Sequence, residues 1–171
     1  MRLNTRVLLA VAVAVLLLVI AYVGVAASSA NGRTQLGAFM MGARIARIEG
    51  RSMEPSCPAG TIIAYRGRAA YGRGEIVAFT MPDRPDQISI KRVIALAGER
   101  VEVTRNGVRI DGQPLDERWP HTPGNYTTPA VLVPRGQYYV LGDQRDSSND
   151  SHLYGPIDGS SILGTGECEA G

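Results

Sequence analysis

Two segments of the chain carry side chains that can work together as a nucleophile and a base. Ser52 lies in EGRSMEPSC (49–57), a stretch in which glycine and proline are typical of a stiff turn. Lys91 lies in the middle of ISIKRVIAL (88–96), a β-favouring run with small or apolar neighbours. Burial in an apolar pocket lowers the pKa of a lysine, so that its neutral amine accepts a proton. A serine hydroxyl within reach of such an amine forms a Ser-Lys pair.

Each segment also has a purely structural interpretation. Ser52 fits an ordinary surface turn, and Lys91 can extend its ammonium group along an apolar face to water. A third segment, GDQRDSSNDSHLYG (142–155), is crowded with Asp and Ser. It fits either a solvated polar loop or a shell of hydroxyls and carboxylates that orients a base. A calcium loop is excluded, because the positions that require Gly and Glu hold Ser151 and Ile157.

Composition narrows the classes of function. The 171 residues are 44% hydrophobic and 20% charged, which supports one domain with a core, alone or with an anchor. The net charge is +2 and no Lys/Arg run is present, so we expect no nucleic-acid partner. No zinc-type spacing of Cys and His occurs, so we expect no metal and no cofactor. Cys57 and Cys168 fit either one disulfide or inert buried thiols.

The N-terminal region predicts a membrane anchor. Arg2 and Arg6 precede an uncharged run from Val7 to Ala27, whose 21 residues reach about 30 Å as a helix, the thickness of a bilayer core. A cleaved signal peptide is the second interpretation, because the small residues ASSA follow the run. Arginines flank both sides of the run, so charge does not decide its orientation.

The remainder predicts a mostly β, antiparallel domain that is partly barrel-like. Short β-favouring runs are separated by Gly, Pro and Asp, and Asn106-Gly107 predicts a hairpin with a type I′ turn. The proline-containing segment 112–130 predicts an extended excursion over the surface. The predicted strands are 61–65, 75–80, 88–96, 100–104, 107–110 and 137–142. The expected organisation is an anchor (1–27), a linker and membrane-proximal segment (28–48) and a catalytic domain (49–171).

Four stretches, in this order after an apolar anchor, resemble the conserved boxes of type I signal peptidases. They are GRSMEPS, GEIVAFTMP, KRVIALAGERV and GDQRDSSNDSHLYG, and together they cover about residues 50–156. The resemblance implies that Ser52 is the nucleophile and Lys91 the general base. It places Met53 at the substrate groove and gives Ser148 a hydrogen bond to the lysine. The remaining polar positions that would brace the site are Asp143, Arg145 and Asp150.

The resemblance also implies a β-rich coiled fold and a single-pass protein of the plasma (inner) membrane. The catalytic domain would face the extracytoplasmic side. The expected partners are preproteins with signal peptides, cut after small residues at sites of the Ala-x-Ala type, and membrane lipid. The sequence does not define an oligomeric state.

The chain departs from the family pattern at three positions. Gly50 stands where some members have a serine that helps to hold the oxyanion, so the Ser52 backbone N–H would carry that task. His152 stands where arginine is usual, which makes an ion pair with Asp150 conditional on protonation. Cys57 replaces a usual aliphatic residue near the nucleophile.

Other functions fit parts of the same pattern. A specialised peptidase that processes conjugative pilins would share the Ser-Lys pair but serve one substrate. A self-cleaving repressor would need DNA-binding helices where this chain has an apolar run. A membrane-anchored binding module would keep the fold without activity. A His-based triad through His152 is the mechanistic alternative.

Overall fold

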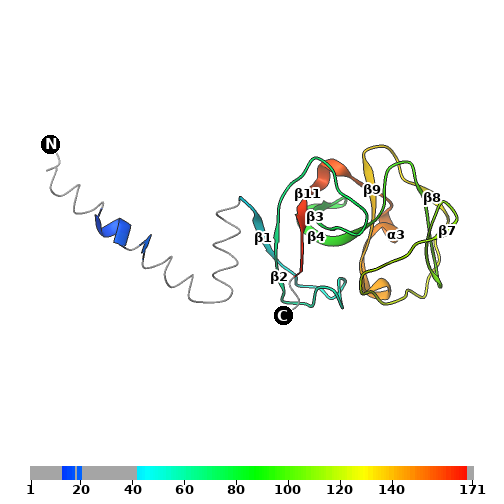
Figure 1. The fold of residues 1–171 in the computed structure, drawn as a ribbon, viewed down its shortest axis with the longest axis horizontal. Coiled ribbons are helices and arrows are strands. Elements are labelled where there is room, and N and C mark those ends of the chain that lie inside the picture. The colour runs from blue at the N-terminus through cyan, green and yellow to red at the C-terminus, as the bar shows by residue number, and fades with distance from the viewer. Residues whose placement is uncertain (1–12, 18, 21–41, 169–171) are drawn as a thin grey trace. The chain divides into compact units, whose positions relative to one another are not determined.

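The computed structural model describes residues 13–17, 19–20 and 42–168 (Figure 1). The chain divides into two compact units, Met1–Ala43 and Arg44–Gly171. The second unit is built of short antiparallel strands, which confirms the predicted mostly β class. The strands are β1 (Arg44–Arg47), β2 (Ile62–Tyr65), β3 (Ile76–Met81), β4 (Arg84–Ala95), β5 (Arg100–Thr104), β6 (Gly107–Ile110), β7 (Gln113–Pro114), β8 (Val131–Leu132), β9 (Gln137–Leu141), β10 (Ile157–Asp158) and β11 (Ile162–Gly166). The short helices are η1 (Arg145–Ser147), α3 (Ser151–Tyr154) and η2 (Gly159–Ser161).

Three sheets make up this unit. A five-stranded sheet has the order β10-β9-β4-β3-β11, a four-stranded sheet the order β7-β6-β5-β8, and β1 pairs with β2. Closure of a sheet requires that its two edge strands pair, and β10 and β11 do not pair with each other. Of the expected partly barrel-like form, the described residues show open antiparallel sheets and no closed barrel.

β4 lies at the centre of the five-stranded sheet, with β3 on one side and β9 on the other. Its outer part, Arg84–Gln87, is exposed, whereas Ile90 to Ala95 are all buried. This explains why the sequence shows an apolar run only over its second half. Lys91 lies opposite Val77 of β3, and Arg92 lies opposite Leu141 of β9. The central strand thus places two adjacent cationic side chains inside the domain.

The core consists of three apolar clusters around the sheets. One cluster packs Met53 and Cys57 against β2 and the alternate residues Ile76 and Ala78 of β3. The opposite residues of β3, Val77 and Phe79, belong to a second cluster, as expected for side chains that alternate between faces. The third cluster lies around β5, β6 and β9 and includes Trp119 from the predicted excursion 112–130.

The predicted hairpin at Asn106-Gly107 is confirmed, but its turn is of another type. β5 pairs with β6 in a register that sets Thr104 opposite Gly107. Gly107 has φ of 110°, whereas Asn106 has no positive φ. A type I′ turn would need positive φ at both central residues, and the observed pattern fits a tight turn followed by a glycine in the bulge position.

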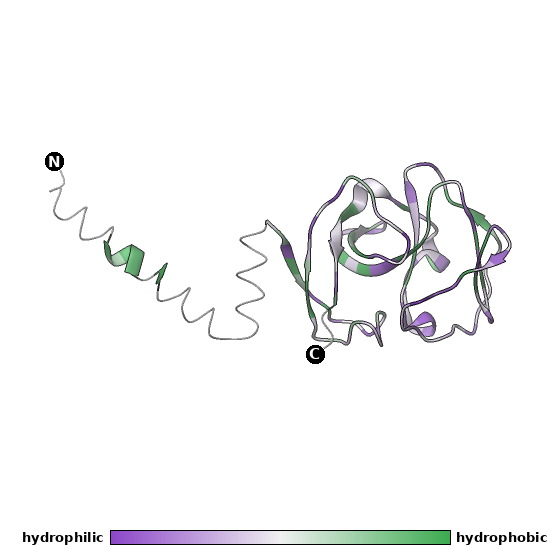
Figure 2. Cartoon of the chain, viewed as in Figure 1, coloured by the Kyte–Doolittle hydropathy of each residue, from purple (hydrophilic) through white to green (hydrophobic). Residues whose placement is uncertain are grey.

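The segment expected as linker and membrane-proximal region contains β1, which pairs antiparallel with β2 along its whole length. The compact second unit accordingly begins at Arg44, whereas the expected boundary followed residue 48. In the predicted anchor, residues 13–17 and 19–20 are helical and hydrophobic (Figure 2). Their side chains are exposed. The other anchor residues lie outside the described residues. Within the described part, no helix is long and apolar enough to cross a membrane.

Candidate active site

The turn that carries Ser52 is held from several directions. The Cys57 backbone N–H donates to the Met53 carbonyl at 2.8 Å, which closes the turn on itself. The Gln144 N–H donates to the Ser52 carbonyl at 3.0 Å and joins the turn to the segment after β9. Ser52 is partly buried, and its hydroxyl points toward β4. The stiff turn expected from the glycine and proline pattern is therefore present.

Lys91 lies inside the protein and reaches Ser52. The Lys91 side chain is 4% exposed, and its Nζ lies 2.8 Å from Ser52 Oγ and 3.0 Å from the Ile90 carbonyl oxygen. Burial lowers the pKa of Lys91 to about 8, and the negative charges of Asp150 and Asp143 oppose that shift. The structure thus brings together the serine and the lysine that the sequence singled out. The solvent-exposed interpretation of Lys91 is wrong.

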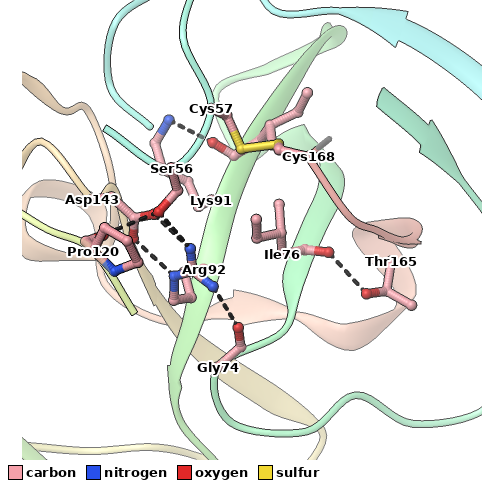
Figure 3. The surroundings of a disulfide bond; sticks show 11 residues. Ser56, Cys57, Gly74, Ile76, Lys91, Arg92, Pro120, Asp143, Thr165 and Cys168 are labelled. Carbon is pink, nitrogen blue, oxygen red and sulfur yellow. Dashed lines mark hydrogen bonds and ion pairs between the residues drawn. A yellow bond between two sulfur atoms is a disulfide. The ribbon is translucent and has the colours of Figure 1, made fainter. Parts of the chain in front are cut away.

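Asp143 forms a buried ion pair with Arg92, the residue next to Lys91. Arg92 donates from Nε to Oδ1 at 2.9 Å and from Nη2 to Oδ2 at 2.6 Å, while Asp143 is fully buried. Arg92 also donates to the Gly74 carbonyl at 2.7 Å and to Ser56 Oγ at 3.1 Å (Figure 3). Its guanidinium lies 5.1 Å from the centre of the Trp119 ring. Arg92 therefore joins β4, the turn that carries Ser52 and the predicted excursion 112–130.

Arg145 and Asp150 both bind the backbone directly after β9. Arg145 donates from Nε to the Gly142 carbonyl at 3.0 Å and forms a buried ion pair with Glu117. Asp150 is fully buried and accepts from the Gly142 N–H at 2.9 Å. Its other oxygen lies 2.8 Å from Nδ1 of His152. Arg145 and Asp150 thus both bind the backbone of Gly142. Gly142 lies close to the Ser52 carbonyl, which accepts from the Gln144 N–H.

The structure also places the other expected site residues. Met53 is fully buried in the first core cluster. Ser148 Oγ is buried and has no hydrogen-bond partner among the described residues, so the expected bond to the lysine is absent. Gly50 is exposed, and a Cβ added there would meet no atom within 4 Å.

Cys57 and Cys168 form a disulfide, with their Cα atoms 5.5 Å apart (Figure 3). The two residues are 111 positions apart in the sequence. Cys57 ends the turn that carries Ser52, and Cys168 follows β11, which pairs with β3. The bond therefore ties the turn of Ser52 to the sheet that carries Lys91, and the alternative of inert free thiols is wrong.

Sequence reasoning missed Arg92 and Glu117 as parts of the site. A signal for Arg92 was present, since it is a second charged residue within an apolar strand. Glu117 has no local signal, because its partner Arg145 is 28 residues away. A cavity of about 1010 Å³ beside the disulfide is lined by Arg73, Arg92, Trp119 and Cys168 among others, but not by Ser52 or Lys91. Among the described residues, no group of three or more His, Cys, Asp and Glu side chains gathers as a metal site would require.

Several known proteins are similar to this chain in sequence. The family model described as signal peptidase, peptidase S26, matches residues 4–169. A probable signal peptidase I-1 of Synechocystis is 45% identical over 53% of this chain and 50% of its own. A signal peptidase I of Leptolyngbya laminosa is 39% identical over 54% of this chain and 49% of its own. The chain thus spans about half the length of these curated relatives.

More distant relatives match a longer stretch. Signal peptidase IB of Staphylococcus aureus is 31% identical over 68% of this chain and 72% of its own. A crystal structure of a signal peptidase I from Enterococcus faecalis is 30% identical, with a TM-score of 0.49, over 58% of this chain and 98% of that one. Because the family model matches nearly the whole sequence, the chain belongs to the signal peptidase family, peptidase S26.

Proposed function

We propose that the chain is a membrane-anchored serine endopeptidase that removes N-terminal signal peptides from exported preproteins. Ser52 is its nucleophile, Lys91 is its general base, and cleavage follows small residues at sites of the Ala-x-Ala type. The observation that carries the proposal is the 2.8 Å separation of Lys91 Nζ and Ser52 Oγ inside the domain. A base with a pKa of about 8 is matched to proton transfer near neutral pH.

The reaction proceeds through an acyl-enzyme. Ser52 Oγ attacks the scissile carbonyl while its proton passes to the neutral amine of Lys91. The Ser52 backbone N–H, which makes no hydrogen bond to a described residue, stabilises the oxyanion, and Gly50 offers no hydroxyl as a second donor. Lys91 then gives its proton to the leaving amine as the carbon–nitrogen bond breaks. It next deprotonates the water that releases the product and regenerates Ser52.

The anchor belongs to the same proposal. The uncharged run from Val7 to Ala27 has the length of one membrane span, and residues 13–17 and 19–20 within it are helical. Because the family resemblance implies an extracytoplasmic catalytic domain, we place this domain on the outer side of the plasma membrane and Arg2 and Arg6 on the cytoplasmic side. Its partners are then lipid and membrane-bound preproteins. Alkaline extraction of membranes tests this placement: an anchored chain stays in the pellet, whereas release into the supernatant contradicts it.

The activity is tested with the full-length chain in liposomes and a preprotein that carries an Ala-x-Ala site. The parent should cleave after the second alanine, as read by mass spectrometry, and Ser52→Ala should not. Lys91→Arg keeps a positive charge but provides no neutral base, so it should also be inactive. Ser160→Ala, at an exposed serine of η2, is the matched control and should cleave as the parent does.

The outcomes separate the candidate functions. Cleavage that survives both Ser52→Ala and Lys91→Arg contradicts the Ser-Lys assignment. A panel of unrelated preproteins tests substrate range, because a specialised pilin-processing peptidase would cut one of them. No cleavage of any preprotein, with no labelling of Ser52 by serine-directed acylating probes, would identify an inactive binding module.

A further inference from the structure

His152 lies at the start of α3, with 15% of its side chain exposed. Its Nδ1 lies 2.8 Å from Oδ1 of Asp150, and its backbone N–H donates to the same oxygen at 3.1 Å. The imidazole stacks on the ring of Tyr126, with ring centres 4.3 Å apart and planes inclined by 26°. His152 is therefore fixed by three contacts.

Asp150 connects His152 to the Ser52–Lys91 pair. Its second oxygen accepts from the Gly142 N–H at 2.9 Å, and a Cβ added to Gly142 would lie 2.5 Å from the Ser52 carbonyl oxygen. Asp150 also exerts the largest charge effect on Lys91, in the direction that favours the protonated amine. The Asp150 carboxylate thus binds the backbone of Gly142 beside Ser52 and also raises the pKa of Lys91.

The groups around His152 define its electrostatic setting. The carboxylate of Asp150 lies against Nδ1 of the imidazole, and the ring of Tyr126 stacks on its face. Tyr126 itself has its pKa raised by burial and by the negative charges of Asp150 and Asp146, which the positive charge of Arg145 opposes. Arg145 is already held in a buried ion pair.

The charge of Asp150 acts on several titratable groups of neighbouring elements. Tyr139 of β9 and Tyr154 of α3 both have their pKa raised by burial and by Asp150, that of Tyr139 to about 12, so both are neutral near neutral pH. Asp150 also acts on Tyr126 and on Lys91 of β4. A change of charge on His152 therefore alters the field that Asp150 exerts on Lys91.

We propose that His152 is a positioning residue of the Ser52–Lys91 pair: it orients Asp150, and its protonation offsets the Asp150 charge so that cleavage persists at mildly acidic pH. This inference rests on the proposed peptidase function. With neutral His152, the carboxylate favours the protonated form of Lys91, which is inactive as a base. With protonated His152, the pair of charges is neutral, and Lys91 loses its proton more readily.

Two substitutions separate charge from hydrogen bonding. His152→Gln keeps an N–H donor for Asp150 but is neutral at every pH, whereas His152→Arg is always charged. We expect His152→Gln to match the parent near pH 8.5 but to be about threefold to tenfold less active near pH 6, where a histidine side chain can carry a proton and a glutamine side chain cannot. His152→Arg should shift the acid limb of kcat/KM to lower pH. Ser160→Ala, at the exposed serine of η2, is the control and should follow the parent.

The second readout does not depend on cleavage. Lys91 is the only lysine in the chain, so selective ¹³C-lysine labelling of the full-length protein gives one side-chain NMR signal. Its titration midpoint should be lower in His152→Arg than in His152→Gln. Equal lysine midpoints in His152→Arg and His152→Gln would overturn the inference. It would also be overturned if the kcat/KM profile of His152→Gln matched that of the parent at every pH, or lay below it by the same factor at every pH. If the parent cleaves no preprotein, the proposed function fails, and the lysine signal still decides the role of His152.

Discussion

Removal of the Cys57–Cys168 disulfide should destabilise the catalytic domain strongly. The bond closes a loop over a sequence separation of 111 residues, and loss of this constraint on the unfolded chain corresponds to about 4.8 kcal/mol at 25 °C. Cys57 is fully buried, so Cys57→Ala combined with Cys168→Ala avoids placing an unpaired hydroxyl in the core. At about 2–4 °C per kcal/mol, Tm should fall by about 10–20 °C.

The assay is urea unfolding of the full-length chain in detergent micelles, followed by circular dichroism. A reductant should destabilise the parent by a similar amount and leave the double alanine variant unchanged, which serves as the control. Because Cys57 ends the Ser52 turn, peptidase activity should fall in the reduced parent before it unfolds. A loss in unfolding free energy below about 1 kcal/mol would refute the reasoning, since a loop of this length predicts several times more.

Three further changes test the site. Asp143→Asn leaves Arg92 buried without its ion-pair partner, so the unfolding free energy should fall by about 3–5 kcal/mol in urea titrations. The same change removes a charge that raises the pKa of Lys91, so the acid limb of kcat/KM should move to lower pH. Gly142→Ala places a Cβ 2.5 Å from the Ser52 carbonyl oxygen, and the displaced turn should reduce kcat/KM by about 100-fold. Because Lys91 has a folded-state pKa of about 8 and an ordinary one of 10.5, the unfolded chain binds more protons between these values. The unfolding free energy should therefore rise with pH in this window, relative to Lys91→Met.

Each of these predictions has a control or a contradicting result. Gly72→Ala is the control for Gly142→Ala, since its added Cβ meets nothing closer than 3.9 Å. Full activity of Gly142→Ala would show that this backbone does not position Ser52. An acid limb that moves to higher pH in Asp143→Asn would contradict the sign of the charge effect. Identical pH slopes for the parent and Lys91→Met would mean that burial does not lower the pKa of the lysine.

The parts of the site that local patterns encode were predictable. A stiff turn at Ser52 follows from glycine and proline, and a lysine within an apolar strand indicates a buried amine. Six of the eleven described strands followed from β-favouring runs, whereas β1, β7, β8, β10 and β11 were not predicted. β4 extends to Arg84 because it pairs with β3 beyond the apolar half. The hairpin at Gly107 was predictable, but the type of its turn was not, since one glycine is compatible with more than one turn.

Features that depend on distant contacts were not predictable from the residues. The disulfide depends on how β11 returns beside the nucleophile turn, which no local pattern specifies. Met53 follows the nucleophile directly, yet the direction of the turn places its side chain in the core. Ser148 has the residue type for a bond to the lysine, but its buried hydroxyl has no partner among the described residues.

The central claim is that Lys91 acts as a neutral base for Ser52, and its protonation can be measured directly. The full-length chain labelled with ¹³C-lysine would be titrated by NMR, and kcat/KM for a preprotein would be measured over the same pH range. The account predicts a single lysine midpoint near pH 8 that coincides with the acid limb of kcat/KM. A midpoint near the ordinary lysine value of 10.5, or an acid limb unrelated to the lysine titration, would contradict it.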